Sequence, residues 1–187
     1  GTTSVYYVSH IDIWQDANAV GRFSMILNNT GGRYNGTFNV NNAVEIDVGG
    51  ATILEGWIDT IHPTGSPSPD VFTQKLEITG RCFGRELVDL TVDKSYPYQP
   101  GDNIIDNLLS VSNSNITYTS PGTATSMSYD SKNEYLLNSF RKICERTGQD
   151  FYVDDNGALQ LFNAGSKGSG ITLQSEAGGT NNILSYE

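Results

Sequence analysis

Short segments that favour strands, separated at close intervals by turn-forming residues, fill the first eighty or so positions of the chain. Residues 72–80 are the clearest of them, because apolar and polar side chains alternate there as in a strand with one face in a core. Residues 44–48 alternate in the same way and run into Gly49-Gly50, a pair that favours a tight hairpin turn. Several short strands joined by turns predict an antiparallel β-barrel or sandwich.

The pattern changes near Gly84 to one that predicts two amphipathic helices. In the first, Asp102 is placed to cap the N-terminus, and isoleucines and leucines up to residue 109 form one apolar stripe. The second is expected to begin after Ser131, which has capping-box spacing to Glu134. It is expected to end at Gly148, a residue type common just beyond a helix.

The order of these segments predicts how the chain is divided. Asn156-Gly157 indicates a hairpin after the second helix, and the glycine- and serine-rich stretch that follows is typical of a linker. We expect a mainly β fold with an α+β part: a β-barrel-like domain at residues 1–84 and a small α+β domain at 85–165. Residues 166–187 are expected to be a linker and the start of a further, truncated β domain, so that the chain is a fragment of a longer polypeptide.

Composition excludes two classes of function. The chain of 187 residues has 21 acidic and 11 basic side chains and a formal net charge of −10. Because affinity for nucleic acid needs clustered lysine and arginine, sequence-specific nucleic-acid binding is not expected. No apolar run is long enough to form a membrane-spanning helix, so membrane insertion is not expected either.

The residue types that carry catalysis or bind metals are few and scattered. His10 and His62 are far apart and have no partner at metal-ligand spacing. Cys82 and Cys144 are interpreted as small buried hydrophobic side chains. The acidic turn before Gly157 lacks the terminal glutamate of a calcium-binding loop. The sequence therefore predicts no catalytic residue, no metal and no cofactor, and we expect that the chain is not an enzyme.

Four acids, Glu45, Asp47, Glu55 and Asp59, fall within one predicted hairpin. Glu55 and Asp59 share a face of one strand, but at about 3.3 Å per residue they lie roughly 13 Å apart, beyond the separation of a glycosidase pair. Whether either approaches the acids across the turn is left open. Two interpretations follow: a solvated strand face, or the negatively charged wall of a pore.

A succession of weak motifs over roughly residues 44–163 resembles the hub protein of phage tails and related contractile injection systems. That family includes the T4-type hub, the late control D proteins and the hub-like proteins of Bacillus prophages. The matching segments are, in order, LEGWIDTI at 54–61, TGRCFGRELVD at 79–89, DNIIDNLL at 102–109, and the stretches 143–148 and 151–162. Residues 82–85 depart slightly from the family pattern.

The resemblance implies an architecture and a place in an assembly. It implies a tail-tube-like antiparallel β-barrel followed by a small α/β insertion domain, with a second barrel beginning near Asn182. The hub of that family is typically a trimer whose paired barrels match a hexameric tube ring above, and a spike or fibre protein attaches below. The implied function is that of a baseplate hub that caps the tail tube and connects it to the spike or fibre, in a virion tail assembled in the host cytoplasm.

Two further expectations depend on this resemblance. Some of the acids Glu45, Asp47, Glu55 and Asp59 would face the lumen of the ring, where they would repel the phosphates of passing DNA. The alternative function is a β-rich receptor- or carbohydrate-binding tail module. A glycan site would require a surface cluster of tryptophan and tyrosine with aspartate and asparagine.

Overall fold

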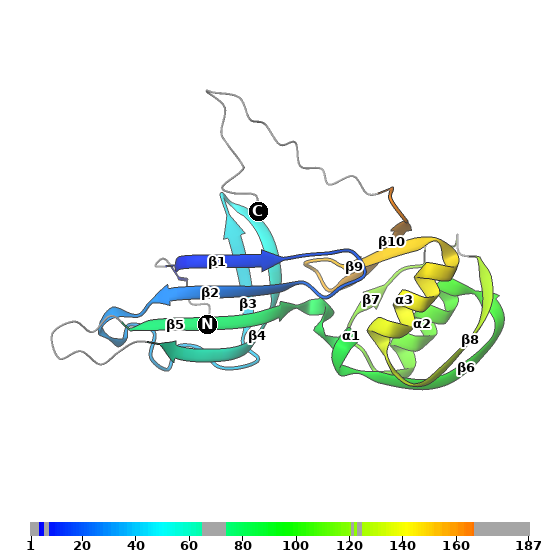
Figure 1. The fold of residues 1–187 in the computed structure, drawn as a ribbon, viewed down its shortest axis with the longest axis horizontal. Helices are drawn as coiled ribbons and strands as arrows, with labels where there is room; N and C mark the ends of the chain where they lie inside the picture. Colours follow the sequence, from blue (N-terminus) through cyan, green and yellow to red (C-terminus); the bar gives the residue numbers. More distant parts are fainter. Residues whose placement is uncertain (1–3, 6–7, 65–73, 121, 123–124, 167–187) are drawn as a thin grey trace, which may run out of the picture.

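The computed structural model describes residues 4–5, 8–64, 74–120, 122 and 125–166. Within these ranges the chain forms a curled antiparallel sheet and, beyond it, a group of helices and shorter strands (Figure 1). We call these the sheet unit and the α+β unit. The expected fold class, mainly β with an α+β part, is confirmed. Among the helices of the described ranges, none is long and apolar enough to cross a bilayer.

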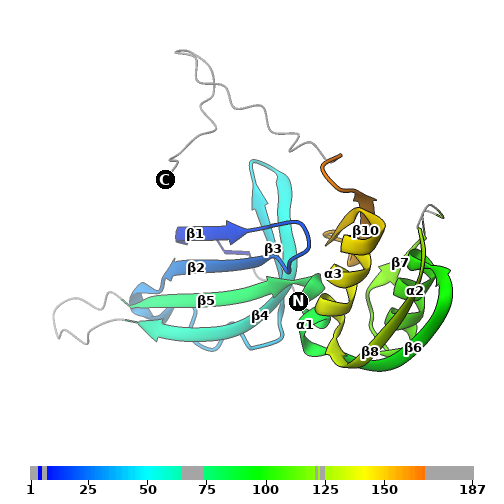
Figure 2. The same cartoon turned by 45° about the vertical axis from the view of Figure 1, so that its right-hand side comes forward.

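The sheet unit consists of five strands in which every neighbouring pair is antiparallel. Their order across the sheet is β1 (Val8–Trp14), β2 (Arg22–Asn28), β5 (Lys75–Cys82), β4 (Ala51–Thr64) and β3 (Ala43–Val48). Figure 2 shows the β3–β4 hairpin standing out from the plane of the other three strands, so that the sheet curls as half of a barrel. β5 overlaps the expected strand at 72–80, whose first two residues lie outside the described ranges.

Both glycines of the predicted β3–β4 turn have positive φ, 64° at Gly49 and 84° at Gly50. Two-residue hairpin turns need this conformation because it matches the twist of the flanking strands. The predicted hairpin is therefore confirmed.

Strand β4 contains a bulge where it pairs with β5. Ile58 lies opposite Gly80 and Thr60 lies opposite Thr79, which leaves Asp59 as an extra residue. The hydroxyls of Thr60 and Thr79 are hydrogen-bonded at 2.7 Å. A bulge bends its strand and increases its twist, which contributes to the curl of the sheet.

A second bulge lies where β4 pairs with β3. The register shifts between Ile46 and Asp47, and Ile53 is the extra residue in β4. The carbonyl of Ile53 accepts a hydrogen bond from Nε2 of Gln15 at 3.0 Å. Because Gln15 directly follows β1, this bond links the end of β1 to β4 across the curl of the sheet.

One face of the sheet carries the first hydrophobic core. The short segment between β2 and β3, with η1 (Thr30–Gly32), contributes Tyr34 and Phe38 to this cluster. Buried Asn29 anchors the segment, because its Oδ1 accepts a hydrogen bond from the backbone N–H of Tyr34 at 2.7 Å. The largest fully buried side chains of the cluster are Phe23, Leu27, Leu54 and Ile78.

The α+β unit follows after one turn of 3₁₀-helix and contains a long two-stranded ribbon, a three-stranded sheet and two main helices. The ribbon pairs β6 with β8, and the small sheet has the order β7-β10-β9, in which β7 and β10 are parallel. The 3₁₀ turn is η2 (Phe83–Arg85), and the elements of the unit after it are α1 (Glu86–Asp89), β6 (Thr91–Pro100), α2 (Gly101–Val111), β7 (Thr117–Tyr118), β8 (Ser126–Tyr135), α3 (Leu136–Thr147), β9 (Gln149–Val153) and β10 (Ala158–Asn163).

Helices α2 and α3 pack together over the second hydrophobic core. The apolar stripe predicted for α2 is buried, and α3 buries its own stripe around Phe140. The ring of Phe140 meets that of Phe151 from β9 edge to face, with centroids 5.8 Å apart. The predicted C-terminal residue of α3 is also confirmed, because Gly148 adopts the left-handed conformation with φ 70°.

The expected capping box at Ser131 and Glu134 is wrong, because both residues belong to strand β8. Ser131 is fully buried, and its hydroxyl donates to the carbonyl of Val92 at 3.0 Å. Glu134 accepts a hydrogen bond from the hydroxyl of Tyr129 at 2.8 Å. Both side chains thus bond to groups of the ribbon, and α3 begins only after Tyr135.

The expected cap of α2 is also displaced. The helix begins at Gly101, with Pro100 at the capping position, so that Asp102 lies inside the first turn. The Asp102 side chain is 2% exposed and accepts a hydrogen bond from the backbone N–H of Asn103 at 3.0 Å. It also accepts one from the hydroxyl of Ser120. Asp102 therefore ties the start of α2 to the segment after β7.

Candidate functional site

The four acids singled out from the sequence lie on the face of the sheet opposite its core. Along β4, Leu54 and Ile58 are buried, and because successive side chains of a strand alternate between faces, Glu55 points to the opposite side. Glu45 of β3 is the direct partner of Glu55. Asp47 follows two positions further along β3. The pairing that the sequence left open is therefore observed between the two strands.

Three of the four acids, Glu45, Asp47 and Glu55, form a group of like charges together with Asp155 from the turn between β9 and β10. Partial burial raises the pKa of Glu55, and the charges of Glu45, Asp155 and Asp47 raise it further. Like charges directly opposite each other across a sheet destabilise it. This group, which we call the acidic end of the hairpin, comprises Glu45, Asp47, Glu55 and Asp155.

Asp155 was missed by the sequence analysis, which interpreted residues 154–157 only as a turn. The turn between β9 and β10 reaches back to the sheet unit, where the Asp155 carboxylate lies near the backbone of Glu55. Burial raises the pKa of Asp155, and the neighbouring charge of Asp154 adds to this. Nothing local in the sequence signals the contact, because its two members are a hundred residues apart.

Replacing Glu55 by glutamine is expected to stabilise the protein at neutral pH by about 0.5 kcal/mol, the scale of exposed charge pairs. Because its pKa is raised in the folded chain, the charged carboxylate favours unfolding at neutral pH, and this penalty disappears as the pH falls through the raised pKa. The gain should therefore shrink between pH 7 and pH 4. Urea denaturation at the two pH values measures it.

Glu145→Gln is the matched control, because Glu145 is exposed on α3 and far from the acidic end of the hairpin. It should change the free energy of unfolding little at either pH. A loss of stability for Glu55→Gln at pH 7 would contradict repulsion within the group.

Asp59 does not belong to this group, because two arginines balance its charge. Arg81 binds both oxygens of its carboxylate, through Nε at 2.6 Å and through Nη2 at 3.0 Å. Nη1 of Arg85 lies 3.6 Å from Oδ1 of Asp59. Arg81 also donates to Asp89 at 3.1 Å. The hydrogen bond to Asp59 is the largest cause that raises the pKa of Arg81.

The histidines and cysteines do not form a reactive group in the described part of the chain. His10 and His62 face the same side of the sheet, but β2 and β5 separate their strands. Burial raises the pKa of the Cys82 thiol and raises that of the Cys144 thiol to about 12, so neither is a ready nucleophile. Over the described ranges, no three histidine, cysteine or acidic side chains are arranged to hold a metal ion.

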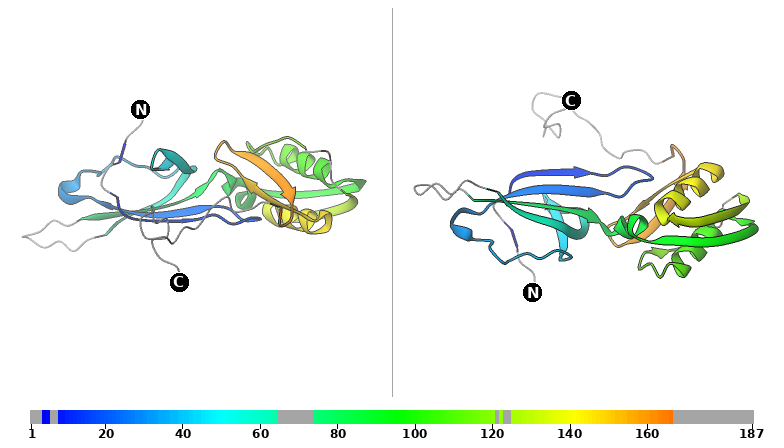
Figure 3. Two further views of the ribbon diagram at one scale, coloured as in Figure 1. Left: turned by 90° about the horizontal axis from the view of Figure 1, so that it is seen from above. Right: turned by 60° about the horizontal axis from the view of Figure 1, so that its bottom comes forward.

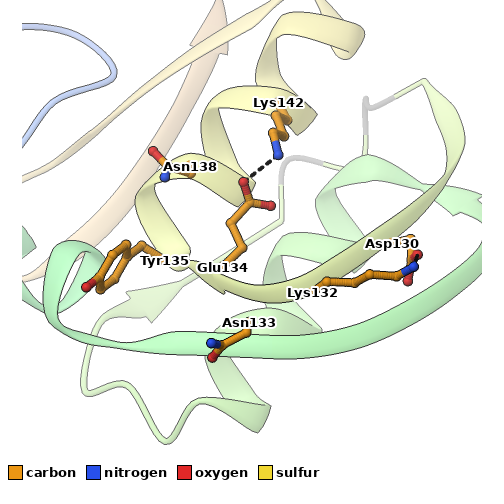
Figure 4. Close-up of a pocket in the computed structure, with 7 residues that line it drawn as sticks. All are labelled: Asp130, Lys132, Asn133, Glu134, Tyr135, Asn138 and Lys142. Atoms are coloured by element: carbon orange, nitrogen blue, oxygen red, sulfur yellow. Dashed lines mark hydrogen bonds and ion pairs between the residues drawn. The ribbon is translucent and has the colours of Figure 1, made fainter.

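An open polar hollow lies where β8 meets α3 (Figure 4). Its Glu134 is paired with Lys142, and Tyr135 is turned away from that pair. Burial raises the pKa of Glu134, but hydrogen bonds from Lys142 and Tyr129 outweigh this and lower it overall. Tyr135 is the single aromatic side chain of the hollow, which does not make the aromatic cluster expected of a glycan site. The lining residues are Asp130, Lys132, Asn133, Glu134, Tyr135, Asn138 and Lys142.

Comparison with known proteins gives matches in structure alone. No protein-family model and no curated protein sequence matches the chain. A 43 kDa tail protein of prophage MuSo2 from Shewanella oneidensis superposes with a TM-score of 0.63 at 16% identity, over 92% of this chain and 59% of that one. The chain has the fold of prophage tail proteins.

Two further structures share this tail-protein fold. Prophage tail protein gp18 from Listeria monocytogenes superposes with a TM-score of 0.58 at 11% identity, over 81% of this chain and 43% of that one. The E. coli c3393 protein matches with a TM-score of 0.60 at 10% identity, over 83% of this chain and 48% of that one. It is described as a type VI secretion component with similarity to the T4 tail proteins gp27 and gp5. The chain thus spans less than two thirds of each of these structures.

Proposed function

We propose that the chain is a structural component of a phage-like tail, and specifically part of a baseplate hub that caps the tail tube and connects it to a spike or fibre. The observation that carries this proposal is the extent of the match. The superposition with the MuSo2 tail protein covers 92% of the chain, so it includes both the curled sheet and the α+β unit. The likeness to a secretion component similar to T4 gp27 and gp5 favours a hub over other tail parts.

The proposed assembly follows the family that the sequence resembles. Residues 1–84 would form a tube-like barrel domain, 85–165 a small α+β domain, and 166–187 a linker leading to a further β domain. In the full-length protein, three copies would form the hub below a ring of tail-tube protein. Its site would be the baseplate of a virion tail that assembles in the host cytoplasm. The role is non-enzymatic, which the burial of both thiols favours.

We also propose that the outward face of β3 and β4 lines the lumen of this ring. Glu45, Asp47 and Glu55 would give that wall an uncompensated negative charge, and a wall of this sign repels the phosphates of DNA. Asp59 would lie on the same wall but add no net charge, because Arg81 and Arg85 balance it.

A cryo-electron microscopy reconstruction of intact tails that carry the full-length protein tests the proposal. We expect three copies at the tip of the tube, in contact with the last tube ring, with Glu45 and Glu55 directed at the channel. Copies along a side fibre without contact to the tube would overturn the hub assignment and favour the receptor-binding alternative. If the protein occupies the hub position but all four acids face the outer surface, the hub assignment would stand and the proposal of an acidic lumen wall would be wrong.

A further inference from the structure

The sheet unit and the α+β unit meet at two separate places. One is η2, through which the chain passes from β5 into α1. The other is the loop between β1 and β2, which lies beside β9 in Figure 1. Figure 3 shows the orange β9–β10 hairpin at the junction of the two units. The hairpin is therefore in a position to contact both places.

The contacts around η2 are aromatic, apolar and charged, and the charged ones include the bond from Arg81 of β5 to Asp89 of α1 at 3.1 Å. The rings of Trp57 from β4 and Phe83 from η2 meet edge to face, with centroids 5.7 Å apart. The guanidinium of Arg85 lies over the Trp57 ring, 5.6 Å from its centroid. On the other side, Val153 of β9 packs near Gly84, and Gly157 of the turn lies against Phe83. This short connector lies between the two units and therefore has the position of a hinge.

The β1–β2 loop contacts the α+β unit through Val20, which packs against both hydrophobic cores, and through hydrogen bonds that are concentrated on Asn18. Its backbone N–H donates to the carbonyl of Phe151 at 2.8 Å, and its Oδ1 accepts from the N–H of Phe151 at 2.9 Å. Its Nδ2 donates to Oδ1 of Asp150 at 2.6 Å, and its carbonyl accepts from Nε of Arg141 at 2.7 Å. Every polar group of this one residue is thus bonded to the α+β unit.

Asn18 occupies the free edge of the small sheet. Strand β9 is an outer strand in the order β7-β10-β9, so the N–H and carbonyl of Phe151 that point away from β10 would otherwise be unpaired. Asn18 supplies both partners and adopts a left-handed conformation with φ 57° to do so. Asparagine tolerates this conformation better than most residues, and surrounding bonds are needed to hold it.

We propose that η2 is a hinge between the two units and that Asn18 is the clasp that holds this hinge in one orientation. The contacts around η2 lie next to the covalent connection, where a change of angle displaces them least. The four hydrogen bonds of Asn18 lie at a second point, away from η2, and hold the two units at one angle. Opening the clasp would widen the range of angles between the two units, with Val20 left as an apolar contact of the loop. This inference does not rest on the proposed function.

Asn18→Gly is the first test variant. Glycine keeps the left-handed backbone and its two bonds and removes both side-chain bonds. Hydrogen exchange at the Phe151 amide should become about tenfold faster or more, because that amide loses its acceptor. Asn18→Asp is the second variant: it places a carboxylate against that of Asp150, and its effect should be larger.

A distance measurement tests the orientation itself. Spin labels at Val48→Cys and Lys132→Cys, one exposed site on each unit, should give a narrow distribution in the parent and a broader one in each Asn18 variant. The native Cys82 and Cys144 are buried and should not be labelled. Asn113→Gly is the matched control, because Asn113 is exposed and has a similar φ of 55°. It should leave both the exchange and the distances unchanged.

Two results would overturn the proposal. In the first, both Asn18 variants keep the parental exchange rate at Phe151 and the parental distance distribution. In the second, Asn18→Gly loses its helical circular dichroism and its tryptophan emission together, which would make Asn18 a requirement for folding. Faster exchange together with a broadened distribution and intact spectra supports the clasp.

Discussion

Replacing Gly80 by alanine is expected to unfold the sheet unit, at a cost of about 3 kcal/mol or more. A Cβ at this position would lie 2.2 Å from the carbonyl oxygen of Trp57 and 2.5 Å from the ring of Phe23. The first contact is to the backbone of a central strand, and the second is to a ring that is 1% exposed. Neither neighbour can retreat without disturbing the core.

Urea denaturation followed by tryptophan emission measures this effect selectively. The chain has two tryptophans, Trp14 and Trp57, and both lie in the sheet unit. Thr79→Ala is the neighbouring control, because it removes one hydroxyl hydrogen bond to Thr60 and should cost about 1 kcal/mol or less. A Gly80→Ala variant as stable as this control would show that β5 packs less closely against its neighbours than the structure indicates.

Replacing Phe140 by alanine is expected to destabilise the α+β unit by about 4 kcal/mol, within the range for buried phenylalanines. Phe140 is 0% exposed and packs edge to face on Phe151. Alanine would leave a cavity between α3 and the small sheet. The helical signal in far-ultraviolet circular dichroism should then be lost at lower urea than in the parent.

Asn138→Ala is the control on the same helix, because Asn138 is exposed and alanine is the better helix former. It should be neutral or slightly stabilising. If the two cores are independent, Phe140→Ala should move the helical transition and leave the tryptophan transition in place. A common shift of both transitions would contradict the proposed division near residue 84.

Features encoded by neighbouring residues could be predicted from the sequence. Gly49-Gly50 forms the expected hairpin because the turn conformation is a local property. The stripe on α2 is buried as expected because helical periodicity needs no knowledge of the partner. The left-handed end of α3 at Gly148 is equally local. The sequence therefore predicted most elements of both units, and much of their order.

Features that depend on distant residues could not be predicted. The spacing of Ser131 and Glu134 fits a helix cap, but tertiary hydrogen bonds keep both in β8. Asp59 has the same charge as the other hairpin acids, and only the fold brings Arg81 to it. Asp155 reaches Glu55 through a turn from the other unit. The candidate site could thus be predicted in residue type but not in grouping.

The extra residue Asp59 in β4 also affects how this strand is compared with those of distant relatives. Alternation between the two faces holds from Leu54 to Ile58 and changes phase at Asp59, after which Ile61 rather than Thr60 packs towards the core. A sequence alignment that assumes strict alternation along β4 therefore matches core-facing residues of one protein with outward-facing residues of another beyond Asp59. A superposition compares backbone positions and does not require that matched side chains point to the same face of the strand. We therefore expect a comparison of sequences at 16% identity to be least dependable in β4 beyond Asp59.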